Sequence, residues 1–356
     1  MPLWTVLTPI AGLGLLALGG ALGLQGVGLA LACAVGLIGA VIAAVHHAEV
    51  VAHRTGEPFG TLVLALAITV IEVALIVSLM LSGGSATAAL PRDTLYATVM
   101  IICNGVVGVC LMLGGWRYRE QSFQVAGAGP ALAALVVLCT ITLVLPVFTT
   151  SSSAGTYTTA QLAFVGLASS ALWAVYVFVQ TVRHRDYFLP AQGAGDEDLH
   201  AQPPSNRAAL ASAAMLPLAL IAVVGLAKLL SPRIEALVAA AQAPKAVVGI
   251  AIAMLVLLPE TWAAVRAARA NRLQTSMNLA LGSALASIGL TVPAVVAAAF
   301  WWDLPLVLGL QPKEMVMLAM TLLVCAITLG SGRTHVMQGA VHLVVFAAFL
   351  FLAWVP

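Results

Sequence analysis

The chain has 356 residues, of which 62% are hydrophobic and only 8% are charged, and its formal net charge is +2. Charged residues make up about a quarter of a typical soluble domain, so this composition excludes a soluble globular protein. The small net charge argues against a nucleic-acid partner. The apolar runs are continuous over about 20 residues, whereas strands of a membrane β-barrel alternate over about 10. The sequence therefore predicts an all-α polytopic membrane protein.

Hydropathy along the chain predicts about eleven transmembrane helices. The longest polar interruption, residues 183–208, contains the acidic run Asp196, Glu197 and Asp198 and is interpreted as a cytoplasmic linker. It divides the chain into a leading helix (1–25), a first five-helix repeat (26–182) and a second five-helix repeat (209–356). An odd number of spans in each repeat makes the second repeat inverted, a common plan among transporters. The predicted spans are 4–23, 27–52, 60–82, 94–115, 130–149, 158–181, 209–230, 244–266, 275–300, 313–330 and 334–354.

The distribution of Lys and Arg predicts the orientation in the bilayer. With these spans, ten of the 15 basic residues fall on the side of the N-terminus and five on the other side. Basic residues accumulate in cytoplasmic loops. We therefore expect a cytoplasmic-membrane protein with its N-terminus in the cytoplasm and its C-terminus outside.

Each predicted repeat places one glutamate within an apolar span. Glu72 lies twelve residues after Gly60, near the middle of 60–82, and Glu260 lies in 244–266. A charge at that depth costs on the order of 2.5–3.5 kcal/mol, so such residues usually mark an ion or proton pathway. The alternative is an ion pair that holds the bundle together, but neither apolar stretch contains a Lys or Arg partner.

Neighbouring residues could complete a cation site around these carboxylates. A carboxylate in a low-dielectric site has a raised pKa, so it can exchange a proton for a cation near neutral pH. Pro259 removes a backbone hydrogen bond and frees a carbonyl oxygen, a ligand type that calcium takes in sets of about 6–8. Each acidic span is followed by a span with further side-chain oxygens. The candidate additional ligands are Thr69, Asn104 and Ser283, with helix packing as the alternative for Asn104 and Ser283.

Three stretches together resemble a known family. They are GEPFGTLVLALAITVIEVALI from Gly56, ICNGVVGV from Ile102 and LLPETWAAVRAARANRLQTSMNLALGSALASIGLTVP from Leu257. They resemble the bacterial ChaA-type calcium/proton antiporters of the cation/calcium exchanger superfamily. The resemblance implies eleven helices, the first outside two inverted five-helix repeats, and alternating access driven by the proton gradient. It also implies that Glu72 and Glu260 bind the cation and the protons in turn.

The sequence departs from the wider exchanger pattern, in which each acidic helix reads Gly-Asn-x-x-Glu. Ile68-Thr69 and Val256-Leu257 occupy the Gly-Asn places here. Thr69 still offers an oxygen, whereas Leu257 does not. Calcium is the favoured ion, and sodium or potassium on the same scaffold remains open.

Two further groups of residues have structural alternatives. His46, His47, Glu49 and His53 end the second span, without the HExxH order of a zinc protease. Glu49 and Glu57 are interpreted as lining the cytoplasmic mouth, and the histidines as interfacial packing. The five cysteines lie inside apolar runs without a CxxC pair, so we expect small core residues.

The function expected from the sequence is secondary cation/proton antiport, with Ca²⁺, Na⁺ or K⁺ and H⁺ as transported ions, the lipid bilayer as surroundings and no resident cofactor. An intramembrane enzyme is the alternative from another class. It needs a nucleophile with its base, or a full set of metal ligands, within the spans, and neither is evident. A channel is a third alternative, but conduction does not require paired proton-exchanging carboxylates.

Overall fold

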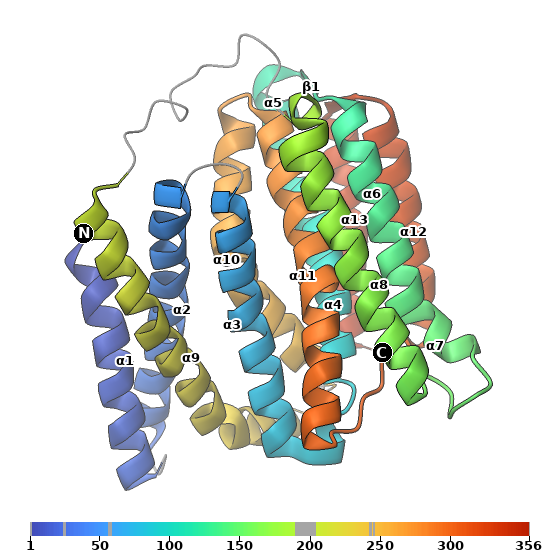
Figure 1. Ribbon diagram of the computed structural model, residues 1–356. Helices are drawn as coiled ribbons and strands as arrows, with labels where there is room; N and C mark the ends of the chain where they lie inside the picture. The colour runs from blue at the N-terminus through green and yellow to red at the C-terminus, as the bar shows by residue number, and fades with distance from the viewer. Residues whose placement is uncertain are drawn as a thin grey trace. The chain divides into compact units, whose positions relative to one another are not determined.

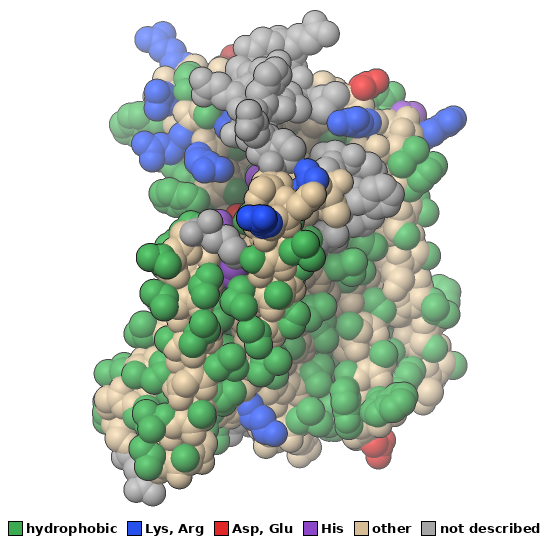
Figure 2. Space-filling view, turned by 60° about the vertical axis from the view of Figure 1, so that its left-hand side comes forward, with side chains coloured by type: hydrophobic (Ala, Val, Ile, Leu, Met, Phe, Trp, Pro, Cys, Tyr) green, Lys and Arg blue, Asp and Glu red, His purple; other side chains and the backbone are tan. Residues whose placement is uncertain are grey.

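The computed structural model describes residues 2–23, 26–55, 59–188, 204–241, 244 and 246–355, with the side chains of 59–65, 235, 238 and 239 outside the description. Within the described part, eleven helices are long and apolar enough to cross a bilayer (Figure 1). The predictions of eleven spans and of an all-α membrane fold are therefore confirmed. Hydrophobic side chains cover the flanks of the helices in the space-filling view, and most Lys and Arg side chains lie toward their ends (Figure 2).

The chain folds into two compact units. Unit 1 consists of Met1–Thr87 and Glu197–Val248, and unit 2 of Ala88–Asp196 and Gly249–Pro356. Each predicted repeat contributes helices to both units, so the division by contacts differs from the division by repeats. The repeat boundaries stay a prediction.

Unit 1 is built from four long helices joined by close approaches of small residues. In it, α2 packs against α1, α3 and α9. A Cβ at Gly12 of α1 would meet the Cβ of Ala222 of α9 at 3.2 Å, so small side chains allow these helices to touch. The elements of unit 1 are α1 (Leu3–Leu22), α2 (Val27–Thr55), α3 (Phe59–Gly83), η1 (Gly84–Thr87) and α9 (Asn206–Ala240).

Three spans of unit 2 contain π-helical segments: η2 and η3 lie inside their spans, and η4 ends its span. A π-helical turn changes the backbone hydrogen-bonding pattern and often occurs at functional sites. Most residues of the span Leu90–Tyr118, which contains η2, are buried, so this span forms the centre of the unit. The helical elements of unit 2 are α4 (Leu90–Met100), η2 (Ile101–Val106), α5 (Val107–Tyr118), α6 (Val125–Cys139), η3 (Thr140–Val144), α7 (Leu145–Phe148), α8 (Thr159–Phe178), η4 (Val179–Arg183), η5 (Arg185–Tyr187), α10 (Ala246–Arg269, with its first turn in unit 1), α11 (Leu273–Trp302), α12 (Pro312–Gly330) and α13 (Val336–Trp354).

A short two-stranded sheet, which the sequence analysis did not predict, joins two loops of unit 2. Strand β1 (Glu120–Ser122) pairs antiparallel with β2 (Arg333–His335), with Gln121 opposite Thr334. In Figure 1, β1 lies at the same end of unit 2 as the end of α5, opposite α7. The sheet therefore ties the α5–α6 and α12–α13 connections together at one end of the unit.

All five cysteines are buried and free of disulfides, which confirms the prediction that they are small core residues. Cys103 of η2, Cys139 of α6 and Cys325 of α12 are each no more than 1% exposed. Within the described residues no group of three or more His, Cys, Asp and Glu could hold a metal ion.

Candidate cation and proton site

Glu72 lies within α3 of unit 1, where it is 2% exposed. Its Oε1 atom is buried. Thr69 is also buried and precedes Glu72 by three residues, which places both side chains on the same face of the helix. The helix that carries Thr69 and Glu72 packs against both α2 and α9 within unit 1.

Glu260 lies in the part of α10 that belongs to unit 2, and both of its carboxylate oxygens are buried. The helix continues from Ala246 to Arg269 through Pro259. The helix break expected at this proline is therefore not observed. One turn of α10 is reinforced by the hydroxyl of Thr261, which donates to the carbonyl of Leu257 at 2.7 Å. The carboxylate is therefore displayed from a regular helix rather than from an unwound segment.

The α10 helix runs parallel to the central span α4–η2–α5. At its start, a Cβ on Gly249 would lie 2.9 Å from the carbonyl carbon of Asp93 in α4. At its end, the carbonyl of Arg269 accepts a hydrogen bond from the hydroxyl of Tyr118 at 2.9 Å. Glu260 and Asn104 each lie eleven residues beyond the first contact, or roughly 16 Å at about 1.5 Å per residue. Both residues are therefore equally far along their spans from the contact between Gly249 and Asp93.

Asn104 lies in η2, fully buried, and its side chain is directed at α12 and α13. Its Nδ2 donates to Thr321 Oγ1 at 2.9 Å, and its Oδ1 lies 3.4 Å from His342 Nδ1. The amide, predicted as a cation ligand with helix packing as the alternative, is thus hydrogen-bonded to two neighbouring helices within the core. His342 and Thr321 were not singled out from the sequence, although a histidine in a predicted apolar span is itself a signal of a buried polar group.

Hydroxyl groups recur along one face of α11. Ser283 is half-buried, and Ser287 and Thr291 are buried. Their spacing of four residues places the three side chains in one row of the helix. The structure thus brings Ser283 into the same unit as Glu260 and Asn104, and it adds Thr291, which the sequence analysis did not name.

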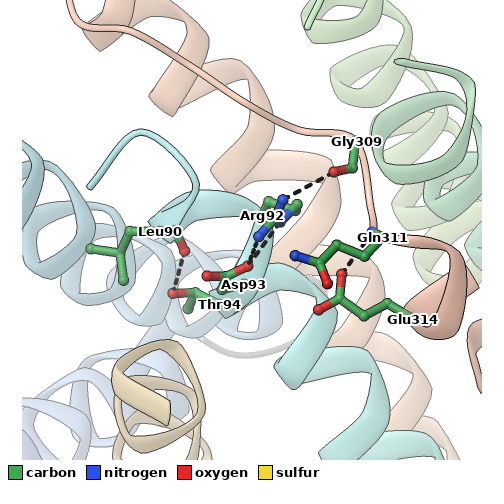
Figure 3. A network of polar contacts seen from close by, with 7 residues as sticks. All are labelled: Leu90, Arg92, Asp93, Thr94, Gly309, Gln311 and Glu314. Carbon is green, nitrogen blue, oxygen red and sulfur yellow. Dashed lines mark hydrogen bonds and ion pairs between the residues drawn. The ribbon is translucent and has the colours of Figure 1, made fainter. Parts of the chain in front are cut away.

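An ion pair marks the end of unit 2 opposite β1. Arg92 Nη2 lies 2.7 Å from Asp93 Oδ1, and Arg92 Nη1 donates to the carbonyl of Gly309 at 3.1 Å (Figure 3). The carboxylate of Glu314 lies beside them in Figure 3 and accepts from the backbone N–H of Gln311 at 2.9 Å. The carboxylates of Asp93 and Glu314 therefore lie near the guanidinium of Arg92 at the start of α4. Asp93 lies one residue before the predicted span 94–115 and next to Arg92, so its sequence context did not mark it as an intramembrane carboxylate.

The predicted cytoplasmic mouth is described in part. Glu49 is half-buried in α2, and Glu57 lies outside the described residues. His47 is fully buried: its Nε2 lies 2.9 Å from the carbonyl of Thr5, and its Nδ1 lies 3.2 Å from Ser212 Oγ. These contacts support the packing interpretation for His47.

Comparisons with known proteins assign this architecture to a family. The family model described as sodium/calcium exchanger protein matches residues 25–182 and 211–355, which together make up most of the chain. The chain belongs to the sodium/calcium exchanger family. This exchanger is therefore a multi-pass membrane protein that transports cations by antiport and is not an enzyme.

Two relatives of the exchanger cover most of its length. It is 50% identical to the protein y4hA of Sinorhizobium fredii over 358 aligned positions, which cover 100% of this chain and 97% of the relative. It is 37% identical to the sodium-potassium/proton antiporter ChaA of Escherichia coli, with 89% of this chain and 86% of the relative covered. The predicted membership of the cation/calcium exchanger superfamily is confirmed.

Solved structures share the fold of the exchanger at low sequence identity. The structure of native YfkE superposes with a TM-score of 0.74 at 17% identity, covering 99% of this chain and 100% of that one. The H⁺/Ca²⁺ exchanger CAX superposes with a TM-score of 0.70 at 14% identity, covering 98% of this chain and 88% of that one. These likenesses confirm the eleven-helix exchanger fold.

Proposed function

We propose that this exchanger trades a cation for protons, and that Glu72 and Glu260 bind both in turn. The observation that carries the proposal is the burial of a glutamate within an apolar helix in each compact unit, Glu72 in α3 and Glu260 in α10. A buried carboxylate is costly as a bare charge, so it is stable when it holds either a proton or a cation. The two states exclude each other, and that exclusion couples the two ion flows.

Sodium or potassium is the ion that the site supports best. At the place where the wider family pattern has an asparagine, Leu257 is apolar and only 3% exposed. Calcium takes about 6–8 oxygen ligands, and an apolar side chain at this position reduces the number available. The name of the relative ChaA, a sodium-potassium/proton antiporter, supports the same ion class.

Calcium, the ion that the sequence pattern favoured, is the second candidate. Two carboxylates carry two negative charges, which match one divalent ion or two protons. Ser283, Ser287 and Thr291 offer further oxygens along α11. Neither candidate requires a resident cofactor, and both place the protein in the cytoplasmic membrane with its N-terminus inside and lipid around its apolar flanks.

The test is proton movement in everted membrane vesicles that carry a preformed pH gradient. We expect Na⁺ or K⁺ to collapse the gradient for the wild-type exchanger, whereas micromolar Ca²⁺ collapses it if calcium is the transported ion. Glu72→Gln and Glu260→Gln remove the exchangeable charge. We expect each variant to lower the rate at least about tenfold, the equivalent of about 1.4 kcal/mol.

The matched control is Glu120→Gln. Glu120 is 54% exposed at its side chain and lies 3.5 Å from Arg333 in a surface ion pair, which contributes little to stability. This variant should transport at the wild-type rate. Wild-type rates in both Glu72→Gln and Glu260→Gln would show that the two glutamates are structural.

A further inference from the structure

A buried histidine lies in the core of unit 2. His342 is in α13 and is fully buried. Its approach to the central span depends on two glycines of that span. A Cβ at Gly108 would lie 3.1 Å from the Cβ of His342, and a Cβ at Gly105 would lie 3.2 Å from the ring of Phe346. The missing side chains let α13 come close enough for the imidazole to reach η2.

The ring is part of a continuous hydrogen-bond chain. Thr328 Oγ1 lies 3.1 Å from His342 Nε2, and His342 Nδ1 lies 3.4 Å from Asn104 Oδ1. Asn104 Nδ2 donates to Thr321 Oγ1 at 2.9 Å, and that hydroxyl donates to Met100 Sδ at 3.3 Å. Three separate elements are joined through one amide, since α12 supplies both threonines, α13 the histidine and η2 the asparagine.

The directions of these bonds fix the form of the imidazole. An amide oxygen only accepts, so His342 Nδ1 carries the proton that Asn104 Oδ1 receives. In the neutral ring Nε2 is then an acceptor, and it takes the proton of the Thr328 hydroxyl. When the imidazole is neutral, every donor of this hydrogen-bond network has an acceptor. The network therefore suits a fixed neutral histidine rather than one that gains and loses a proton.

The hydrogen-bond network around Asn104 lies in a span that contacts α10, the helix of Glu260. Asn104 and Glu260 each lie eleven residues beyond the contact between Gly249 and Asp93, in two parallel spans that contact each other at both ends. A π-helical turn inside an α-helical span is rare and often occurs at functional sites. Asn104 anchors η2, since Thr321 holds one end of its amide and His342 holds the other.

We propose that His342 is a positioning residue of the exchanger: through Asn104 it fixes the π-helical segment η2 of the span that contacts α10, the helix of Glu260, and so sets the affinity for the transported cation. This inference rests on the proposed function, because Glu260 is its reference point. His342 touches neither cation nor transported proton in this role. Its contribution is the donor at Nδ1.

Two neutral replacements separate the two ends of the ring. His342→Asn places an amide N–H near the position of Nδ1 and keeps a donor for Asn104. His342→Gln places its amide near the position of Nε2, which keeps the contact to Thr328 and loses the donor for Asn104. We expect the apparent KM for the transported cation to rise at least about fivefold for His342→Gln, the loss of one buried hydrogen bond. His342→Asn should stay within about twofold of wild type, with an unshifted pH profile.

The assay is antiport in reconstituted liposomes, run with the cation to which the wild type responds. Val344→Ala, whose side chain is 69% exposed on the same helix, is the control and should match wild type. Thr321→Val removes the other anchor of Asn104 at nearly constant volume, and it should reproduce the KM rise if His342→Gln does not yield folded protein by size-exclusion chromatography.

The outcomes distinguish this inference from the proposed function. Wild-type protein without any cation/proton antiport overturns the proposed function itself. Antiport in the wild type together with an unchanged KM in folded His342→Gln or Thr321→Val overturns only the role of His342. Equal loss of rate in His342→Asn and His342→Gln, with a shifted pH profile, also overturns it, because a proton carrier would behave in that way.

Discussion

His47 shows how a single buried polar residue joins helices of unit 1. Its Nε2 faces the carbonyl of Thr5 in α1, and its Nδ1 faces the hydroxyl of Ser212 in α9. A carbonyl only accepts, so Nε2 carries the proton and Nδ1 accepts from Ser212. One imidazole therefore connects α1, α2 and α9, and removal of either partner leaves a buried nitrogen or oxygen unsatisfied.

Ser212→Ala tests this connection. The substitution leaves Nδ1 of His47 buried without its donor, which costs about 1–3 kcal/mol. We expect a lower melting temperature in detergent, measured by differential scanning fluorimetry. Ser170→Ala is the control, since the Ser170 hydroxyl donates only to the carbonyl of Gly166 in its own helix. Equal melting temperatures for Ser212→Ala and Ser170→Ala would contradict the connecting role of His47.

Glycine determines which helices of unit 2 can touch at the level of whole elements. Gly339 of α13 lies against the backbone of Met112 in α5, where a Cβ would approach the Met112 Cα to 2.8 Å. Gly249 of α10 lies against Asp93 of α4 in the same manner. The neighbouring atoms are backbone, which cannot move aside as the end of a flexible side chain can. These contacts bring α13 and α10 up to the central span.

Gly339→Ala should therefore push α13 away from α5. We expect a destabilisation of about 1–3 kcal/mol, typical of overpacking, seen as a lower melting temperature. Gly129→Ala in α6 is the matched control, because a Cβ there meets nothing within 4 Å. Equal melting temperatures for Gly339→Ala and Gly129→Ala would show that α13 can shift without cost.

For the whole molecule, the charge pattern predicts how the chain lies in the bilayer. The loop with Ser122 belongs to the side that is rich in Arg, and the loop with Ser151 belongs to the other side. Both serines are exposed. The five native cysteines are buried, so they leave a low background for thiol labelling.

Cysteine substitution at these two serines tests the orientation in intact cells. With a membrane-impermeant maleimide, Ser151→Cys should be labelled at once and Ser122→Cys only after the membrane is permeabilised. The wild-type chain serves as the unlabelled control. The reverse pattern would place the N-terminus outside, contrary to the Lys and Arg distribution.

The sequence by itself determined the class of protein, the number of spans and the position of two glutamates inside apolar spans. These follow from local properties, because about 20 consecutive apolar residues must cross the bilayer and a carboxylate inside such a run has few explanations. The same local logic identified the cysteines as core residues. Span ends differed by several residues at α9, which continues to Ala240 because Pro232 is accommodated inside the helix.

The tertiary structure alone decided which residues meet. Periodicity places Asn104 on a face, but only the packing of α12 and α13 reveals that Thr321 and His342 hold its amide. The sequence likewise did not predict the β1–β2 pair, because its hydrogen bonds join residues far apart in the chain. It did not predict the π-helical segments either, because each depends on a single extra residue in a helical turn. Local chemistry therefore fixed what each span contains, and long-range packing fixed what each polar group binds.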